Sequence, residues 1–299
     1  MLSNMIMTVA ILTGGESAER EVALKSAAYV QEKLSEQVTT ELYVFPKDIE
    51  RFIKDRPTLV AAVPVFHGRG GEDGVVQGFL ELAGMDYVFS GVRAHSIAMD
   101  KAQAKCLVKE AGFNVPDGVV LQRHGHYAYQ EPVVVKPMDA GSSIGVSVVR
   151  SAGELDQALN KAFEQSDRVL VEQFIEGREF TVGVLNDGEA LPVIEVISRY
   201  DFFDFECKYD PELCEEIVAP DIHEELAERL RSVAIAAHKR IGARHLSRTD
   251  MIVRDDGEIF FLEINTIPGL TPVSLVPKAL DAAGYDLGEL LMGWIRDMG

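Results

Sequence analysis

The stretch RTDMIVRDDGEIFFLEINTIPG, residues 248–269, decides the fold that the sequence predicts. Within it, Asp256-Gly257 is typical of a two-residue turn that joins two strands of a β-hairpin. Residues counted equally outward from such a turn face each other, so the hairpin is expected to pair Asp250 with Glu263. Two facing carboxylates repel each other and destabilise a sheet. A divalent cation between them would remove this repulsion.

Other residues of the hairpin extend the same face, because side chains alternate along a strand. Arg248 is expected opposite Asn265, while Ile252 and Phe261 continue the face as an apolar surface. A solvated polar face at a sheet edge is the alternative, but the apolar continuation favours the floor of a cleft. Oxygen ligands suit Mg²⁺, which usually also binds substrate phosphates. The expected metal ligands are Asp250, Glu263 and Asn265.

Length and composition are those of an ordinary globular protein. The chain has 299 residues, 47% of them hydrophobic and 26% charged, enough for two domains or three small ones. A net charge of −19 disfavours nucleic acid and anionic membranes as partners. We expect neither a membrane span nor a signal peptide. Cys106, Cys207 and Cys214 lack metal-binding spacing, which favours free thiols in the cytoplasm.

The N-terminal pattern predicts an α/β fold with a parallel sheet. Loops at the carboxyl ends of parallel strands hold ligands, and Glu19 and His67 are expected there. The predicted strands of this region are 8–13, 38–45 and 59–66, and its predicted helices are 17–34 and 76–84.

Two further regions follow, with mixed α+β character. The expected domains are 1–93, 94–178 and 179–299. Asp100 and the capping box of Ser151 and Glu154 are each predicted to start a helix. Residues 198–220 are predicted to form a long functional loop. The predicted strands are 117–121, 132–136, 145–149, 168–174, 179–185 and 190–197, and the predicted helices are 101–111, 151–165, 223–241 and 287–296.

The loop KPMDAGSSIG, residues 136–145, is a second centre of chemistry. Lys136 ends an apolar strand, and the small residues after it leave backbone N–H groups open to a phosphate. The sequence matches neither a P-loop nor a dinucleotide-binding fingerprint. Glycine-serine turns are usually only turns. Together with Lys101 and the acidic hairpin, however, the loop predicts a site for a nucleoside triphosphate and Mg²⁺.

Two other features have alternative interpretations. Glu172 ends a predicted strand and Glu179 follows it. Carboxylates in this position suit the binding of a nucleoside. The alternative is that they form a solvated acidic strand end. Arg248, two residues before Asp250, suits a substrate carboxylate or a developing oxyanion. The alternative is an arginine that merely neutralises the acids.

Four motifs in this order resemble the D-alanine–D-alanine ligases of the ATP-grasp superfamily. They are HGRGGEDG at 67–74, GSSIG at 141–145, RTD at 248–250 and LEINTIPG at 262–269. The resemblance covers nearly the whole chain. It implies a cytoplasmic homodimer that makes a cell-wall dipeptide. It also implies ATP between the central and C-terminal domains, with two Mg²⁺ ions that Mn²⁺ can replace.

The resemblance also implies roles for individual residues. Glu19 would receive the ammonium of the first D-alanine, and Arg248 its carboxylate and the oxyanion. Ser142 and Tyr209 would pin a mobile loop to Glu19, and Lys208 would reach the transferred phosphoryl group. Further substrate contacts would be His67, Gly269, Ser274 and Leu275. The phosphates of ATP would be bound by Lys101, Lys136, Ser142 and Ser143. The adenine would lie beside Glu172 and Ile175, and the ribose would be held by Glu179.

The implied reaction has two steps: formation of an acyl phosphate, then attack on it by the amine of the second D-alanine. Three features of the sequence are compared with the pattern of the family. Gln173 stands where the family often has lysine, residues 122–131 are short, and Tyr209 after Lys208 favours D-alanine over D-lactate. The alternatives are another ATP-grasp carboxylate–amine ligase and a nucleotide-binding module without catalysis. The complete polar face of the hairpin counts against the second.

Overall fold

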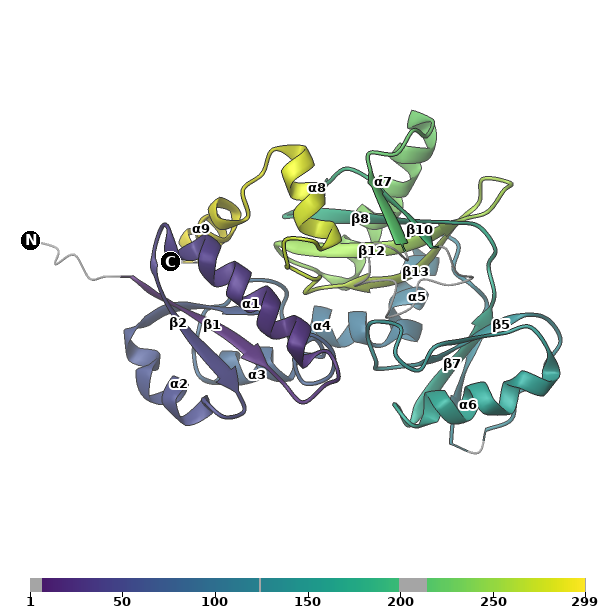
Figure 1. The fold of residues 1–299 in the computed structure, drawn as a ribbon, viewed down its shortest axis with the longest axis horizontal. Helices are drawn as coiled ribbons and strands as arrows, with labels where there is room; N and C mark the ends of the chain where they lie inside the picture. The colour runs from purple at the N-terminus through teal and green to yellow at the C-terminus, as the bar shows by residue number, and fades with distance from the viewer. Residues whose placement is uncertain (1–6, 124, 199–213, 299) are drawn as a thin grey trace, which may run out of the picture.

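The computed structural model describes residues 7–123, 125–198 and 214–298 of the chain. Within these residues three sheets follow one another, N-terminal, central and C-terminal (Figure 1). The predicted α/β class with an N-terminal parallel sheet is confirmed. Cys207, Lys208 and Tyr209 lie outside the described residues. No helix of the described part is long and apolar enough to cross a membrane.

The N-terminal sheet has the parallel order β2-β1-β3. Its buried central strand is β1, and helix α1 packs on one face while α2 and α3 cover the other. The carboxyl end of β1 leads directly into the loop that carries Glu19. The elements are β1 (Thr8–Gly14), α1 (Arg20–Ser35), β2 (Thr39–Phe45), α2 (Ile49–Asp55), the 3₁₀ helix η1 (Arg56–Thr58), β3 (Leu59–Pro64) and α3 (Val75–Leu82).

Two helices lead to the central sheet, which is antiparallel in the order β4-β7-β5-β6. Asp100 caps α5 as predicted, accepting a hydrogen bond from the backbone N–H of Gln103. The predicted capping box of Ser151 and Glu154 is present too. The elements are α4 (Val92–Met99), α5 (Lys101–Glu110), β4 (Gly118–Gln122), β5 (Val133–Pro137), β6 (Ser147–Val149), the 3₁₀ helix η2 (Ala152–Glu154), α6 (Leu155–Phe163) and β7 (Arg168–Gln173).

The C-terminal sheet has the order β11-β10-β8-β12-β13, with β9 beside β8. Helices α5 and α7 cover one of its faces, and Gly242 ends α7 in a left-handed conformation. The predicted loop 198–220 is wrong in part, because Cys214–Val218 forms a strand paired with β10. The elements are β8 (Arg178–Leu185), β9 (Glu189–Ala190), β10 (Ile194–Ser198), β11 (Cys214–Val218), α7 (Glu224–Ile241), β12 (Leu246–Val253) and β13 (Ile259–Asn265).

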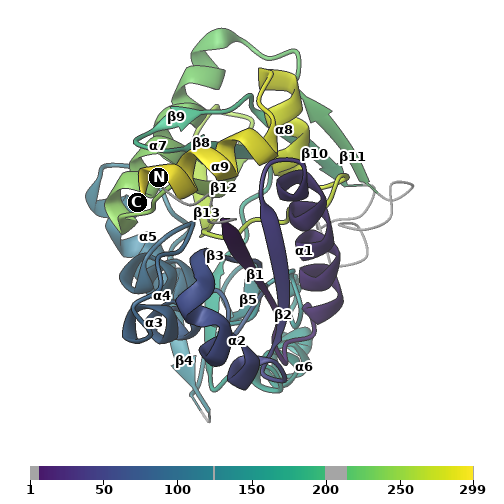
Figure 2. The ribbon, with the colours of Figure 1, turned by 90° about the vertical axis from the view of Figure 1, so that its left-hand side faces the viewer.

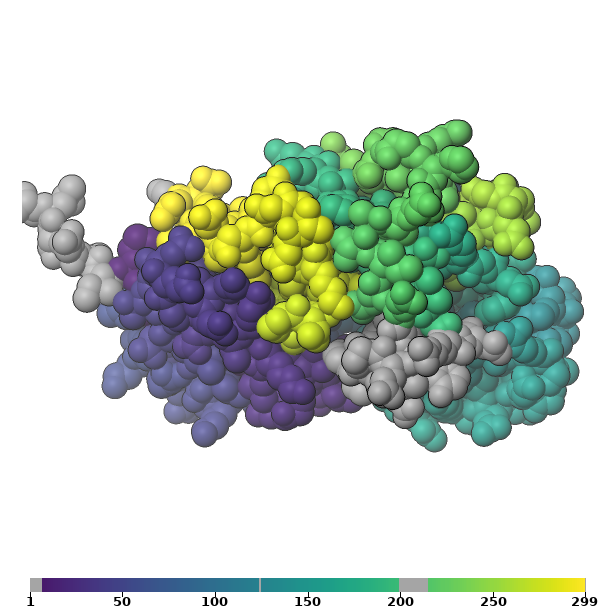
Figure 3. All heavy atoms as spheres, turned by 45° about the horizontal axis from the view of Figure 1, so that its top comes forward, coloured from purple at the N-terminus to yellow at the C-terminus, as the bar shows by residue number. Residues whose placement is uncertain are grey.

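The last two helices return to the N-terminal sheet. Helix α8 (Leu275–Ala283) leads to α9 (Leu287–Asp297), which lies beside α1 (Figures 2 and 3). One hydrophobic cluster joins Val9 and Leu34 of the first elements to Leu291 and Trp294 of the last. The N-terminal sheet therefore completes its core with the C-terminal helices. Helices α2, α4 and α8 were not predicted.

The hairpin of β12 and β13 confirms the main prediction from the sequence. Asp250 faces Glu263, and Arg248 faces Asn265. The predicted two-residue turn is wrong, because the N–H of Arg254 bonds to the carbonyl of Glu258 across a three-residue loop. A bulge between Asp250 and Met251 shifts the register back. The extra residue in the loop and the extra residue in the bulge offset each other.

The bulge also corrects the predicted apolar face. Phe261 pairs across the hairpin with Met251 and not with Ile252 as predicted. Phe261 is fully buried in the core beneath α7, so it does not share the polar face. Leu262 and Glu263 both line the cavity described below, together with Ile252. A bulge re-aims side chains in this way, and here it places one more apolar residue beside the acids.

One buried and one half-buried histidine, His95 and His245, predict how stability depends on pH. Burial is the main reason that the pKa of His95 is lowered to about 3 and that of His245 to about 4, and the charge of Arg244 contributes to both shifts. In the unfolded chain both bind protons below about 6.5, so the unfolded state binds more protons in acid. The free energy of unfolding should therefore fall from pH 6.5 toward 4, by up to ~1.4 kcal/mol per pH unit for His95 and by less for the half-buried His245, which solvent screens.

Urea denaturation between pH 4 and 7 measures this slope. His95→Gln should flatten it, while His126→Gln, which removes an exposed histidine, is the matched control. Equal slopes in the parent and His95→Gln would contradict the assignment.

Candidate active site

Two adjoining cavities lie where the sheets meet. The larger, of about 400 Å³, has walls from the central sheet and a floor from the C-terminal hairpin. The smaller, of about 90 Å³, lies between the hairpin and the loops after β1 and β3. Gly141 and Glu263 line both cavities. A ligand in one cavity can therefore meet a ligand in the other at these residues.

The residues expected to bind ATP and those expected to bind the amino-acid substrate separate between the cavities with one exception: Ser142, expected to bind ATP, lines the smaller cavity and not the larger. The larger cavity is lined by Lys101, Lys136, Ser143, Glu172, Ile175 and Glu179. The smaller is lined by Glu19, His67, Ser142, Arg248, Gly269, Ser274 and Leu275. Of the expected metal ligands, Asp250 lines the larger cavity, Asn265 the smaller and Glu263 both.

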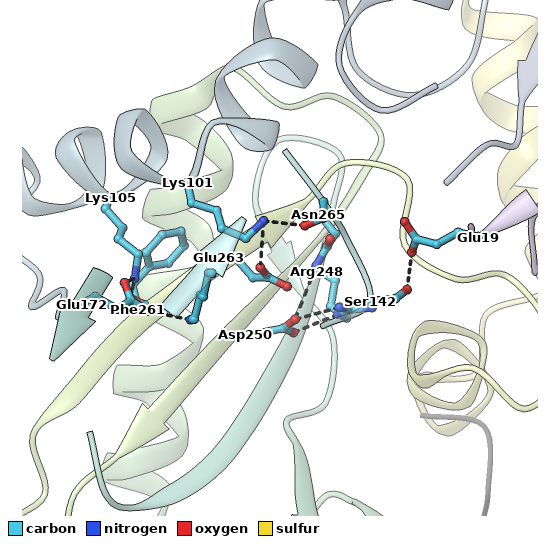
Figure 4. Close-up of polar contacts among 12 residues, drawn as sticks. Glu19, Lys101, Lys105, Ser142, Glu172, Arg248, Asp250, Phe261, Glu263 and Asn265 are labelled. Atoms are coloured by element: carbon cyan, nitrogen blue, oxygen red, sulfur yellow. Dashed lines mark hydrogen bonds and ion pairs between the residues drawn. The ribbon is translucent and has the colours of Figure 1, made fainter. Parts of the chain in front are cut away.

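Each of the two facing acids of the hairpin, Asp250 and Glu263, lies beside a positively charged side chain (Figure 4). Arg248 grips Asp250 with two hydrogen bonds of 2.9 and 2.7 Å, and the Thr181 hydroxyl donates a third of 2.6 Å. Lys101 Nζ lies 3.7 Å from a Glu263 carboxylate oxygen. Burial opposes the charge on Arg248, but Asp250 and Glu263 more than compensate, so its pKa is raised. The protein itself thus offsets the repulsion between the two carboxylates.

The same face offers a partial set of ligands for a metal. Asn265 Nδ2 lies 3.4 Å from Asp250 Oδ2, and Glu263 faces Asp250 across the hairpin, so three oxygen-bearing side chains lie on neighbouring positions. The described residues contain no cluster of three His, Cys, Asp or Glu that could hold a metal by itself. Two carboxylates and an amide fit Mg²⁺ of the kind that substrate phosphates and water complete.

A buried carboxylate lies between two lysines on the central-sheet side. Glu172 forms ion pairs of 2.6 Å with Lys136 and 2.8 Å with Lys105. Burial raises the pKa of Glu172, but the two ammonium groups outweigh it and the net shift is downward. Burial likewise lowers the pKa of Lys136, yet Glu172 reverses this and holds it above its ordinary value. Glu172 and Lys136 are therefore both charged near neutral pH.

The smaller cavity is acidic on one side and closed by the glycine-serine loop. Ser142 donates a hydrogen bond to Glu19, which joins the loop to the N-terminal domain (Figure 4). Burial, with Arg248 nearby, lowers the pKa of His67 to about 4, so this histidine is neutral. Burial and the Glu19 charge raise the pKa of Glu72 to about 8. Of the glutamates that line this cavity, Glu72 is therefore the one that tends to hold a proton around neutral pH.

The sequence reasoning missed Glu72, Lys105 and Thr181. Glu72 belongs to the HGRGGEDG motif, and an acid inside a glycine-rich loop was a usable signal. Thr181 could be found only from the pairing of β8 with β12, which sets it opposite Asp250. Lys105 follows the apolar position Ala104 on α5 and is typical of a solvated lysine, so the sequence carried no signal for its burial.

Gly141 leaves no room for a side chain unless the Glu19 carboxylate moves. A Cβ there would lie 2.6 and 3.0 Å from the two carboxylate oxygens of Glu19. Gly141→Ala should displace the Glu19 carboxylate or the loop, and either shift separates Ser142 from Glu19. Misplacement by about 1 Å can cost on the order of a hundredfold, so kcat/KM for the amino-acid substrate should fall by that factor. Gly153→Ala, where a Cβ meets nothing within 4 Å, is the control. Equal kcat/KM in both variants would refute the docking role.

The central and C-terminal sheets close on one cavity in the manner of the ATP-grasp fold, which places the chain in the class of ATP-grasp ligases. The sequence model of the family "D-ala D-ala ligase C-terminus" matches residues 99–296. The D-alanine–D-alanine ligase of Aquifex aeolicus is 38% identical over 292 residues, 95% of this chain and 98% of that protein. The chain belongs to the D-alanine–D-alanine ligase family.

Solved structures agree with this assignment. The crystal structure of D-alanine–D-alanine ligase from Bacillus anthracis has a TM-score of 0.86 and 32% identity, covering 97% of this chain and 96% of that one. The same enzyme complexed with ATP has a TM-score of 0.84 and 31% identity, again covering 97% and 96%. The likeness therefore extends over all three sheets.

Proposed function

We propose that this chain is an enzyme that joins two D-alanines into D-alanyl-D-alanine, a precursor of peptidoglycan. ATP is consumed through a D-alanyl phosphate, and ADP and phosphate are released. Family membership supports the reaction. The observation that carries the proposal is the pair of cavities that share Gly141 and Glu263. An amino-acid carboxylate in the smaller cavity can reach a terminal phosphate in the larger one.

The larger cavity binds ATP. Lys101 and Lys136 hold the phosphates, together with the backbone of Ser142 and Ser143. The last two have φ values of 48° and 58°, which turn the loop sharply around the cavity. Glu172 and Ile175 border the adenine, and Glu179 holds the ribose. A loop of small residues allows its N–H groups to approach an anion closely.

Asp250, Glu263 and Asn265 hold Mg²⁺, for which Mn²⁺ can substitute. When bound with ATP, the metal offsets the negative charge that gathers where the phosphates meet the attacking carboxylate. The donor set supports this role, because two carboxylates and an amide leave coordination positions for phosphate oxygens.

The smaller cavity binds the D-alanines. Glu19 receives the ammonium of the first, and Arg248 holds its carboxylate. Arg248 uses two of its five N–H groups on Asp250, which leaves others for a substrate carboxylate or oxyanion. Gly269, Ser274 and Leu275 line the carboxylate subsites, with neutral His67 beside them.

In the first step, the D-alanine carboxylate attacks the γ-phosphate of ATP. The lysines and Arg248 orient the two anions and offset their repulsion. In the second step, the amine of the next D-alanine attacks the acyl phosphate, and Arg248 stabilises the oxyanion of the tetrahedral intermediate. No side chain of the protein needs to act as a nucleophile.

Three further proposals concern organisation. The domains run from 1 to 93, 94 to 178 and 179 to 299, the enzyme is cytoplasmic, and it acts as a homodimer. The arrangement of N-terminal, central and C-terminal sheets supports the division.

Phosphate release from ATP, measured with and without D-alanine, tests the function. Release should depend on D-alanine and yield the dipeptide. D-serine and D-lactate should be poorer second substrates in the same assay. ATP turnover indifferent to D-alanine would refute the proposal and favour a different carboxylate–amine ligase.

A further inference from the structure

Lys105 has no part in the proposed reaction, yet it is among the most deeply buried charges of the described residues. Its side chain is 7% exposed, and that of its partner Glu172 is 1% exposed. Helix α5 carries Lys105 toward the C-terminal sheet, where its Nζ also donates a 3.5 Å hydrogen bond to the Phe261 carbonyl. Burying an ammonium costs several kcal/mol unless its partners compensate.

Lys105 lies behind Glu172 as seen from the larger cavity. Lys136 and Glu172 line that cavity, whereas Lys105 is not among the described residues that do. Figure 4 shows Lys105 approaching Glu172 from the helix side. Its ammonium therefore cannot contact a ligand in the cavity directly. Its only ion pair among the described residues is with Glu172, so its contact route to the ligand passes through that carboxylate.

The charges of the three residues explain what such an effect would be. Glu172 and Lys136 by themselves form a neutral ion pair, 2.6 Å long, in which the lysine is held by the carboxylate. A phosphate in the cavity would compete with Glu172 for Lys136. Lys105 pairs with the other carboxylate oxygen of Glu172 and gives the three residues a net positive charge. When Lys136 turns to a phosphate, Lys105 still neutralises the negative charge of Glu172.

We infer that Lys105 is a positioning residue for nucleotide binding: it holds Glu172 so that Lys136 is released to the phosphates. The inference rests on the proposed function only in taking the larger cavity as the nucleotide site. Burial lowers the pKa of Lys105 to about 8, opposed mainly by Glu172. The ammonium form still predominates at pH 7, so the second positive charge is present under ordinary conditions.

The test is a double-mutant cycle of Lys105 and Glu172 in which the measured quantity is the affinity for a nucleotide analogue. Isothermal titration measures the affinity of the full chain for β,γ-imido-ATP with Mg²⁺. Lys105→Met should weaken this affinity about tenfold or more, because Glu172 then retains Lys136. The same substitution in a Glu172→Gln background should cost less than about threefold, because the competing carboxylate is gone. Steady-state kinetics should show a raised KM for ATP with a smaller change in kcat.

Two controls separate this role from a structural one. Lys109→Met removes a lysine one turn further along α5, whose pair with Asp117 is exposed, and should bind the analogue like the parent. Thermal unfolding verifies that each variant is folded. If Lys105→Met is too unstable, Lys105→Gln replaces it in the cycle with the same expected factors.

An equal loss in both backgrounds, or no loss in either, would overturn the inference. A parent chain that binds the analogue but forms no dipeptide would refute the proposed function and leave the inference standing. A parent chain that does not bind the analogue would refute both.

Discussion

Glu263→Gln is expected to lower kcat on the order of a hundredfold or more while leaving the fold intact, because several kcal/mol of charge stabilisation are lost. Glutamine has nearly the same shape, so β13 can keep its pairing. The substitution removes the negative charge at the junction of the two cavities and the ion pair with Lys101. Asp250 alone then carries the carboxylate charge for the metal.

Three measurements together check this expectation. Dipeptide formation at increasing Mg²⁺ gives kcat, thermal unfolding reports the fold, and Mn²⁺ titration with ADP reports metal affinity, which should weaken. Glu258→Gln is the matched control, because Glu258 lies on the same hairpin in a half-exposed pair with Arg254. Near-parent turnover of Glu263→Gln at ordinary Mg²⁺ would rule out the metal assignment.

Arg248→Met is expected to cost up to about a thousandfold in kcat/KM for D-alanine, the upper range for losing one donor to an oxyanion. It also leaves Asp250 without its arginine at a site where the Asp250 side chain is 12% exposed. Removing one partner of a buried ion pair typically costs about 3–5 kcal/mol of stability, so the free energy of unfolding should fall as well.

Arg248→Lys decides between the two interpretations of this arginine. Lysine keeps the positive charge but cannot form the two parallel hydrogen bonds to Asp250 while serving a substrate. If Arg248 holds the substrate and its oxyanion, this variant should recover much of the stability and little of the kcat/KM. Near-parent kcat/KM would instead mean that Arg248 merely neutralises the acids. Arg254→Met, on the exposed end of the same hairpin, controls for losing an arginine.

The sequence predicted the facing of Asp250 and Glu263 correctly although it predicted the turn wrongly, because the extra residue of the loop and the extra residue of the bulge offset each other. It could not predict the bulge beside Asp250. An extra residue in one strand changes the partner of Phe261 without altering the local pattern of apolar residues. Strand β11 was missed because CEEIV is acidic and gains its place only by pairing with β10.

The cavities themselves were less predictable than their individual residues. Motif order implied which side chains serve ATP and which serve the substrate. The burial of Lys105 depends on how α5 packs against the C-terminal sheet, in which Phe261 is 156 residues further along the chain. The raised pKa of Glu72 likewise depends on its burial beside Glu19, which comes from another strand end. Such properties arise from long-range packing, and periodicity within one segment does not record them.

The return of α9 to α1 has a consequence for how the chain acquires its structure during synthesis. The core around Val9 and Leu34 is closed by Leu291 and Trp294. Domains usually fold as units as they leave the ribosome, starting from the N-terminus. Here the first sheet to be made must wait, with part of its apolar surface uncovered, until the last helix emerges. The central sheet has its own core beneath α6 and can mature before the sheet that precedes it.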